Sequence, residues 1–191
     1  MAKNAVIEAI AVEAAPEALN TVIVLPGGQV AVEQELSGAD YWEFLKIASK
    51  NAAEATRWLM LRAYVVNGEA LTIDQLEDED GIGFEGAAVL SSEVAKLFAP
   101  EGEVVESGIA LPGGKVAVKQ KLPGRKFFEF QRMAGEDAIA ATRWVMTQLF
   151  EVDGAALTEA MLTADGLGFK GVALLNQEIN KLFKAALAHK K

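Results

Sequence analysis

The sequence predicts an α+β protein made of two tandem copies of one module, in which a β-hairpin is followed by helices in the order β-β-α-α-α. Three observations predict this fold class. The chain repeats itself internally, each copy carries a Pro-Gly-Gly turn between two apolar runs, and apolar residues recur at helical spacing after each hairpin. The repeat matters most, because it decides how many times the same unit must be built.

The internal repeat divides the chain into segments. The motif Leu-Pro-Gly-Gly at 25–28 returns at 111–114. Gly-Ile-Gly-Phe at 81–84 returns as Gly-Leu-Gly-Phe at 166–169, after a one-residue deletion. We therefore expect an N-terminal arm or extra strand (1–19), copy 1 (20–98), a linker (99–105), copy 2 (106–183) and a basic C-terminal tail (184–191).

Each copy opens with a predicted β-hairpin. Pro-Gly-Gly is a strong turn signal, since proline presets one turn dihedral and glycine accepts a positive φ. In the run that follows, Val30 and Val32 share one face, which we expect to be buried, and Ala31 lies on the other. One hairpin alone is marginal in water, so the two hairpins could join in one antiparallel sheet, with further strands from 5–11 and 103–105.

Helical spacing follows each hairpin. The first helix of copy 1 is expected to begin near Tyr41. A second helix, with apolar residues at helical spacing from Ala52, is expected to end at the Asn-Gly turn dipeptide at 67–68. Thr72 is a good N-cap for a short helical turn, and a final helix is expected over 84–98. We expect the same elements in copy 2.

Composition excludes several function classes. The net charge of −9 argues against nucleic acid as a partner, because phosphate binding relies on clustered Lys and Arg. There is no cysteine, and the single histidine, His189, lies in the basic tail, which leaves little for Cys or His catalysis or for a metal site. No apolar run approaches the ~20 residues of a membrane-spanning helix. We expect a cytoplasmic, non-enzymatic protein with no cofactor, no membrane contact and no small-molecule substrate.

Two motifs that carry chemistry in other proteins stand here in the wrong context. Gly-x-Gly-x-x-Gly at 81–86 spells the dinucleotide-binding fingerprint, but it follows four carboxylates at 77–80 instead of a buried strand. Those charges would repel a pyrophosphate. The same acidic run resembles a calcium loop but lacks the first ligand and the closing Glu. We expect the glycines to mark a helix start and the acidic run to be solvated.

Paired aromatic residues open the first helix of each copy, as Tyr41-Trp42 and Phe127-Phe128. On one interpretation, one ring of each pair covers the hairpin as part of the core and the other ring is partly exposed. On the other, the outward ring of each pair anchors a partner, since aromatic residues are over-represented at binding hot spots. Both interpretations stay open at this stage, and these four residues are candidate partner-binding residues.

The two copies differ most in charge. Copy 1 holds thirteen acidic and five basic residues, and copy 2 holds nine of each. The difference is concentrated on the hairpin, where Glu33 and Glu35 align with Lys119 and Lys121. Exposed charge often reflects solubility alone. Opposite charge at equivalent positions would also select a register, so our hypothesis is that these strand faces meet, within the chain or between chains.

Several short motifs give the module a family resemblance. Leu-x-Gly at 36–38 and 122–124, and Val-x-Gly-x-x-Leu-Thr at 66–72 and 152–158, join a Gly-turn hairpin to an Ala-rich second helix. This arrangement resembles the small tail assembly chaperones of tailed bacteriophages. The resemblance implies a non-enzymatic protein that is made in the cytoplasm of the infected bacterium. It would bind the tape measure protein, and tail tube subunits, until the tail polymerises.

Other functions stay open beside the chaperone. The duplication departs from the single-module pattern of that family, so a permanent virion protein of the tail, neck or capsid is one alternative, and a generic protein-interaction module is another. The expected partners are other phage structural proteins or further copies of the chain. An enzyme built on Glu43 and Glu129 is the weakest option, because these carboxylates are expected on a solvated helix face without a His, Cys or metal partner.

Overall fold

The structure is a computed structural model that describes residues 21–78, 80–99, 104–105, 108–164 and 166–188. The predicted arm with its strand at 5–11, and also Glu103 and His189, lie outside the described residues. The chain forms a mixed α+β fold, as the sequence predicts, and it contains two antiparallel sheets.

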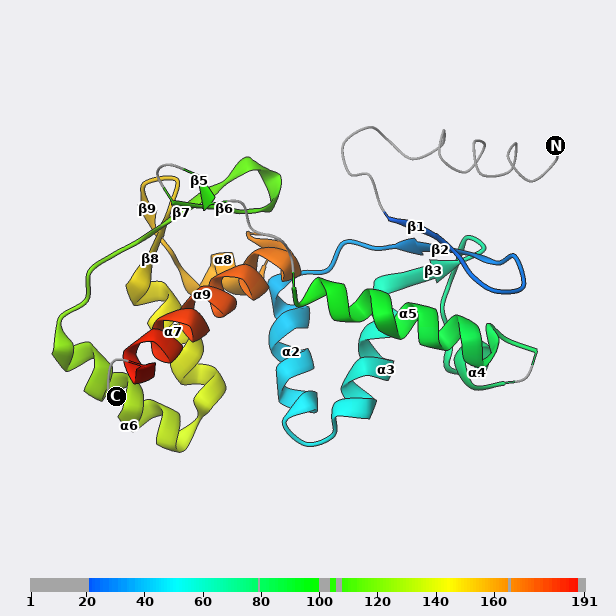
Figure 1. The fold of residues 1–191 in the computed structure, drawn as a ribbon, viewed down its shortest axis with the longest axis horizontal. Helices are drawn as coiled ribbons and strands as arrows, with labels where there is room; N and C mark the ends of the chain where they lie inside the picture. Colours follow the sequence, from blue (N-terminus) through cyan, green and yellow to red (C-terminus); the bar gives the residue numbers. More distant parts are fainter. Residues whose placement is uncertain (1–20, 79, 100–103, 106–107, 165, 189–191) are drawn as a thin grey trace.

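The first half begins with a hairpin and continues with two helices, a second pair of short strands and two more helices (Figure 1). Its elements are β1 (Val22–Val24), β2 (Val30–Glu33), α2 (Gly38–Ala48), α3 (Ala52–Ala63), β3 (Tyr64–Val66), β4 (Glu69–Ala70), α4 (Ile73–Glu77) and α5 (Gly83–Leu97).

The second half has the same order of elements, with one added strand at its start and a longer last helix. Its elements are β5 (Val104–Val105), β6 (Gly108–Ala110), the 3₁₀ turn η1 (Pro112–Gly114), β7 (Val116–Lys119), α6 (Gly124–Glu136), α7 (Ala138–Leu149), β8 (Phe150–Val152), β9 (Ala155–Ala156), α8 (Glu159–Thr163) and α9 (Gly168–Ala188).

Each half has its own sheet, ordered β1-β2-β3-β4 in the first and β5-β6-β7-β8-β9 in the second. The prediction that the two hairpins could join in one sheet is therefore wrong. The reason is that β2 already pairs with β3 of its own half, with Ala31 opposite Val66, so this edge of the hairpin is occupied. The added strand predicted near Val105 is present as β5.

Strands β3 and β4 occupy the place where the sequence predicts the end of the second helix. The chain leaves α3 directly into β3 and turns back at Asn67 and Gly68, whose φ angles are 52° and 86°. Positive φ at both positions belongs to a type I′ hairpin turn, for which Asn-Gly is the preferred dipeptide. The Val30 amide donates to Asn67 Oδ1 at 2.9 Å, which ties this turn to β2.

The buried face of the sheet is the opposite of the one predicted. Ala31 is 0% exposed, whereas Val30 and Val32 are only half-buried. Ala31 lies between Ile23 and Val66 on the side that faces the core. Both faces of this strand are apolar, so alternation alone could not choose between them, and the small alanine side is the one that the core covers.

Side-chain caps set the start of α2. Ser37 Oγ accepts from the Asp40 amide at 3.3 Å, and the Asp40 carboxylate accepts from the Ser37 amide at 2.9 Å. This reciprocal pair is a capping box. Asp40 also accepts from Arg62 Nε at 2.7 Å, which links α2 to α3. In the second half Pro123 precedes α6 and provides no side-chain cap.

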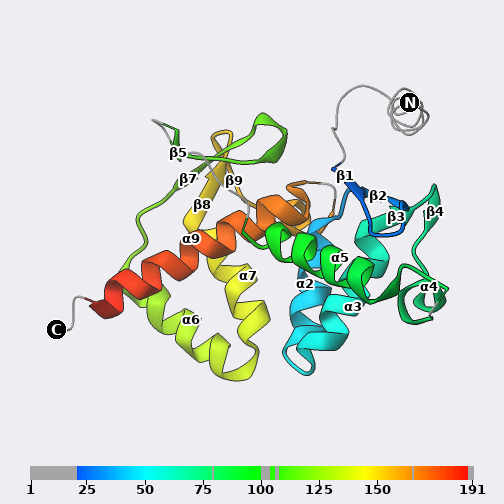
Figure 2. The ribbon, with the colours of Figure 1, turned by 45° about the vertical axis from the view of Figure 1, so that its right-hand side comes forward.

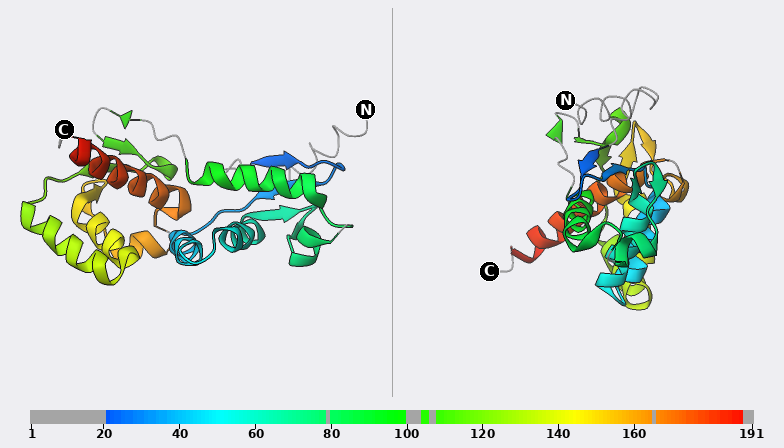
Figure 3. Two further views of the ribbon diagram at one scale, coloured as in Figure 1. Left: turned by 60° about the horizontal axis from the view of Figure 1, so that its bottom comes forward. Right: turned by 90° about the vertical axis from the view of Figure 1, so that its right-hand side faces the viewer.

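The two halves lie side by side along the long axis, and α2 packs against α7, α8 and α9 of the second half (Figures 1 and 2). Two further views show the same arrangement, with α5 and α9 adjoining near the middle of the molecule (Figure 3). Buried apolar side chains from both halves form one continuous core. Among the described helices, none has the length and apolar character needed to span a membrane.

Candidate protein-interaction site

Helix α2 presents its first-turn aromatic residues to the second half of the chain. Tyr41 and Trp42 are only 2% and 6% exposed. Trp42 Nε1 donates to the Leu162 carbonyl at 3.0 Å, and Asn176 Nδ2 donates to the Tyr41 hydroxyl at 2.8 Å. The partner of this candidate pair is therefore the other half of the same chain, because these hydrogen bonds and the surrounding burial leave no free face for a separate protein.

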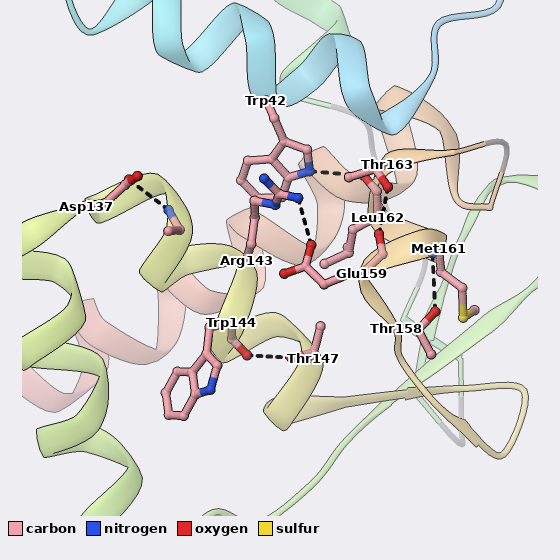
Figure 4. A network of polar contacts seen from close by, with 11 residues as sticks. Trp42, Asp137, Arg143, Trp144, Thr147, Thr158, Glu159, Met161, Leu162 and Thr163 are labelled. Atoms are coloured by element: carbon pink, nitrogen blue, oxygen red, sulfur yellow. Dashed lines mark hydrogen bonds and ion pairs between the residues drawn. The ribbon is translucent and has the colours of Figure 1, made fainter.

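An arginine from α7 closes over the Trp42 ring. The Arg143 guanidinium carbon lies 5.6 Å from the ring centroid, within the range of a cation–π contact. Arg143 Nη2 also donates to Glu159 at 2.7 Å, and Figure 4 shows these side chains converging below α2. The ring is thus held by a hydrogen bond at its edge and by a charge over its face.

A second aromatic contact lies beside the first. Phe169, at the start of α9, inserts between Tyr41 and Phe98, with ring centroids 5.2 and 5.1 Å away in edge-to-face geometry. Phe44 extends the cluster, at 4.4 Å from Phe98. Such pairs contribute beyond the area they bury. Burial raises the pKa of Tyr41 to about 12, and the hydrogen bond from Asn176 opposes part of that rise.

The backbones also approach closely at this contact. A Cβ at Gly38 would lie 2.2 Å from the Leu162 carbonyl oxygen, so only glycine fits there. The Phe169 amide donates to the Leu36 carbonyl at 2.8 Å. We call Leu36, Gly38, Tyr41 and Trp42 the α2 face.

The equivalent surface of the second half carries the same kinds of residue but is open. Phe127 is 46% exposed and Phe128 is 69% exposed, and their rings meet edge to face at 5.8 Å. These are the two remaining aromatic residues that the sequence singles out as partner-binding candidates. The residues Leu122, Gly124, Phe127 and Phe128 are called the α6 face.

An apolar groove opens beside the α6 face. It has a volume of about 180 Å³ and is bounded by α6, α7 and the second part of α9. Phe130 stacks on Phe183 at 5.1 Å on one side of it. The lining residues are almost all apolar: Leu122, Pro123, Gly124, Lys126, Phe127, Phe130, Val145, Leu149, Ile179, Leu182 and Phe183. A surface of this kind can accept an apolar or aromatic side chain from a partner.

The charged hairpin residues have their partners on α9. Glu33 pairs with Lys170 at 2.6 Å across the two halves, and Lys119 pairs with Glu178 at 2.5 Å within the second half. Within the described chain the two strand faces therefore contact α9 and not each other. Burial raises the pKa of Glu178, but hydrogen bonds from Lys119 and Lys181 outweigh it and leave that pKa below its usual value.

The other two charged candidates, Glu35 and Lys121, are exposed. The carboxylates considered for an enzyme also face solvent, where Glu43 pairs with Lys46 at 3.4 Å and Glu129 with Lys126 at 2.9 Å. Over the described residues, no three His, Asp or Glu side chains gather as a metal site.

The glycine motif lies at the start of a helix, and the acidic run lies on the surface. Gly83 begins α5 with a φ of +66°, so the motif marks a helix start, as predicted. In the acidic run, Glu77 forms an ion pair with Arg57, and Asp78 and Asp80 are exposed. Sequence reasoning missed Phe169 as an interface residue. Its position directly after the repeated Gly-x-Gly was the available signal.

A scan of protein-family models and searches of curated proteins and of solved structures found no match to this chain. The interaction surfaces are therefore interpreted from their own geometry. Tyr41 and Trp42 form an aromatic and apolar contact between the two halves of the chain. Phe127 and Phe128 lie exposed beside an apolar groove on α6.

Proposed function

We propose that the chain is a non-enzymatic phage assembly protein that arose by tandem duplication of one module and acts as a tail assembly chaperone in the infected bacterium. One observation carries the proposal: Phe127 and Phe128 stand exposed beside an apolar groove, at the place where the first half contacts the second half through Tyr41 and Trp42. Exposed aromatic residues around an apolar pocket are typical of binding hot spots.

Local geometry supports the duplication. Asn67 and Asp153 both have a φ of 52° at the second hairpin turn of their half. Gly83 and Gly168 both begin the last helix of their half with similar positive φ values, 66° and 63°. Non-glycine residues rarely adopt positive φ, so the match between Asn67 and Asp153 favours one ancestral module, and the glycine pair agrees with it.

The resemblance in sequence supplies the partner, which is the tape measure protein or the tail tube protein of the same phage. The test is co-purification of the chain with each of these two proteins after co-expression. Phe128→Ser should lower the recovery of the partner, because this ring is the most exposed part of the α6 face. Val24→Ser is the control, since Val24 is also exposed, at 58%, but lies on β1. Equal loss with both variants would count against the α6 face.

The same surface also suits a permanent virion protein of the tail, neck or capsid. Mass spectrometry of purified mature particles separates the two functions. A chaperone should be present in infected cells and absent from particles. Recovery from particles at high copy number would overturn the chaperone proposal and favour the structural protein.

A further inference from the structure

Two different surfaces form the contact between the two halves. Each has a counterpart at the equivalent position of the other half, and neither counterpart is covered by the residues that the structure describes. The α2 face of the first half contacts the start of α9 in the second. The equivalent of the α2 face is the α6 face, and the equivalent of the start of α9 is the start of α5. Figure 1 places α4 and the start of α5 at one end of the molecule and α6 at the other.

The exposed ring at the start of α5 is the most telling of these equivalents. Phe169 opens α9 and is 2% exposed, because it inserts between Tyr41 and Phe98. Phe84 holds the same place after the repeated Gly-x-Gly at the start of α5, and it is 90% exposed. Burial of a benzyl side chain this exposed would be favourable, so Phe84 is suited to insertion into an apolar site.

The groove beside α6 is the equivalent of the place that Phe169 fills. Phe127, Phe130 and Phe183 border it, and these residues correspond to Tyr41, Phe44 and Phe98. Tyr41 and Phe98 contact Phe169, and Phe44 contacts Phe98. The groove is open and apolar, with a volume of about 180 Å³. The second half therefore has a site shaped like the one that holds a phenylalanine in the first half.

Helix α6 also has a glycine at the position where the backbones approach closely in the contact between the halves. Gly38 accommodates the Leu162 carbonyl, and a Cβ there would lie 2.2 Å from its oxygen. Gly124 stands at the equivalent position of α6, where a Cβ would meet nothing within 4 Å. Leu76 is the equivalent of Leu162. Gly124 is thus free to receive the Leu76 carbonyl of another molecule.

Charge is complementary at both contacts, with the signs exchanged. Glu33 on the α2 side pairs with Lys170 on α9 at 2.6 Å. The equivalent residues are Lys119 on the α6 side and Glu85 on α5. Lys119 already contacts Glu178 at 2.5 Å, and Glu85 of another copy would approach the same lysine with the charges of the pair reversed. Two independent changes that keep opposite charges opposite are expected of a contact that is used.

A second pair of positions repeats this complementarity. Ala39 and Thr163 line one cavity at the contact between the halves. Their equivalents are Arg125 on α6 and Glu77 at the end of α4, both exposed. The basic start of α6 and the acidic loop before α5 would therefore face each other between two molecules.

We propose that copies of this chain assemble head to tail, with Phe84 of one copy inserted into the α6 groove of the next. The contact repeats the one that joins the two halves, and its occupant is a second copy of the same chain. Because the two surfaces differ, the contact is heterologous and gives a ring or a filament of alternating halves. The inference rests on the proposed function only in using the same α6 face.

The test uses two variants that each block one end. Phe84→Asp and Phe128→Asp both replace strongly exposed rings, so circular dichroism and the melting temperature should match the parent chain. In analytical ultracentrifugation the parent should form larger species as its concentration rises. Each variant alone should weaken self-association roughly 30-fold or more, as expected for an aromatic hot spot. Val24→Ser should assemble like the parent.

A mixture of the two blocked variants decides the matter. The α6 face of Phe84→Asp is intact, and the start of α5 of Phe128→Asp is intact. An equimolar mixture should therefore form a 1:1 dimer whose two outer ends are blocked, and nothing larger. A parent chain that stays monomeric at near-millimolar concentration overturns the inference. So does a Phe84→Asp variant that still dimerises, because the α6 faces would then pair with each other.

The charge pair gives an independent measurement. Glu85→Lys should weaken assembly at low salt, because it places a lysine opposite Lys119 of the next copy. Glu69→Lys is the charge-matched control on β4 and should have no such effect. A monomeric chain that nevertheless loses a tail protein on Phe128→Ser would overturn the self-assembly inference and leave the proposed function standing.

Discussion

Gly38 is the residue on which the contact between the halves depends most directly. A Cβ there would overlap the Leu162 carbonyl, whose atoms belong to the backbone and cannot simply turn away. We expect Gly38→Ala to lower the free energy of unfolding by about 1–3 kcal/mol, the usual range for overpacking. Gly124→Ala is the matched control and should be neutral or slightly stabilising, since its Cβ meets nothing within 4 Å. Urea denaturation of both variants at low protein concentration measures this, and equal effects would contradict it.

The two tyrosines predict how stability depends on alkaline pH. Burial raises the pKa of Tyr41 to about 12, and burial, with the nearby Glu33 and Glu93 carboxylates, raises that of Tyr64 further. The unfolded chain releases these protons near pH 10 and the folded chain does not. Stability that is complete below pH 10 should therefore fall as the pH rises from 10 toward 12. Ultraviolet titration, with urea unfolding in parallel, measures both effects. Tyrosine ionisation near pH 10 in the folded chain would refute the prediction.

Helices α2 and α6 correspond in the order of elements but differ in what covers them. Trp42→Ser should destabilise the fold by about 3–5 kcal/mol, because it removes a buried ring and leaves the Leu162 carbonyl without its donor. Phe128→Ser at the equivalent position should change stability by less than about 0.5 kcal/mol, since that ring is 69% exposed. Thermal and urea unfolding compare the pair. A large loss with Phe128→Ser would mean that α6 is part of the folded core.

At the scale of elements, sequence reasoning succeeded where the signal was local. The Pro-Gly-Gly turns, the capped start at Thr72 and the glycine start of α5 all appear where they were predicted. The strand at 64–66 was missed, although Tyr-Val-Val is β-prone and Asn-Gly is a hairpin signal. The helical spacing of apolar residues before this strand continues into it, so the spacing predicts helix where the residue types favour a strand.

The sequence predicts which residues form the candidate site, but it does not predict which residues contact them. The aromatic pairs at 41–42 and 127–128 were identified from the sequence. The first pair is buried against the second half of the chain, and the second pair is exposed. Which pair is filled depends on Leu162 and Phe169, which lie more than a hundred residues from α2. Contacts of that separation leave no periodic trace in a single sequence.

For the whole molecule, the proposed duplication of a module with two different contact surfaces would have a geometric consequence. Joining two copies in one chain satisfies one contact and leaves one surface of each kind free, at opposite ends. The exposed Phe84 and the open α6 groove are these two ends. Within the molecule the printed charge contact between the halves is local, Lys170 with Glu33 at 2.6 Å.

The two equivalent glycines separate folding from assembly. Gly124→Ala should leave the free energy of unfolding almost unchanged, yet its Cβ would meet the Leu76 carbonyl of the next copy, so self-association should weaken roughly tenfold or more. Gly38→Ala should do the reverse, with lower stability but both end surfaces intact. Sedimentation across a concentration series, at a temperature where both variants are folded, compares them with the parent chain. If Gly124→Ala assembles as well as the parent, the contact between copies does not repeat the contact between the halves.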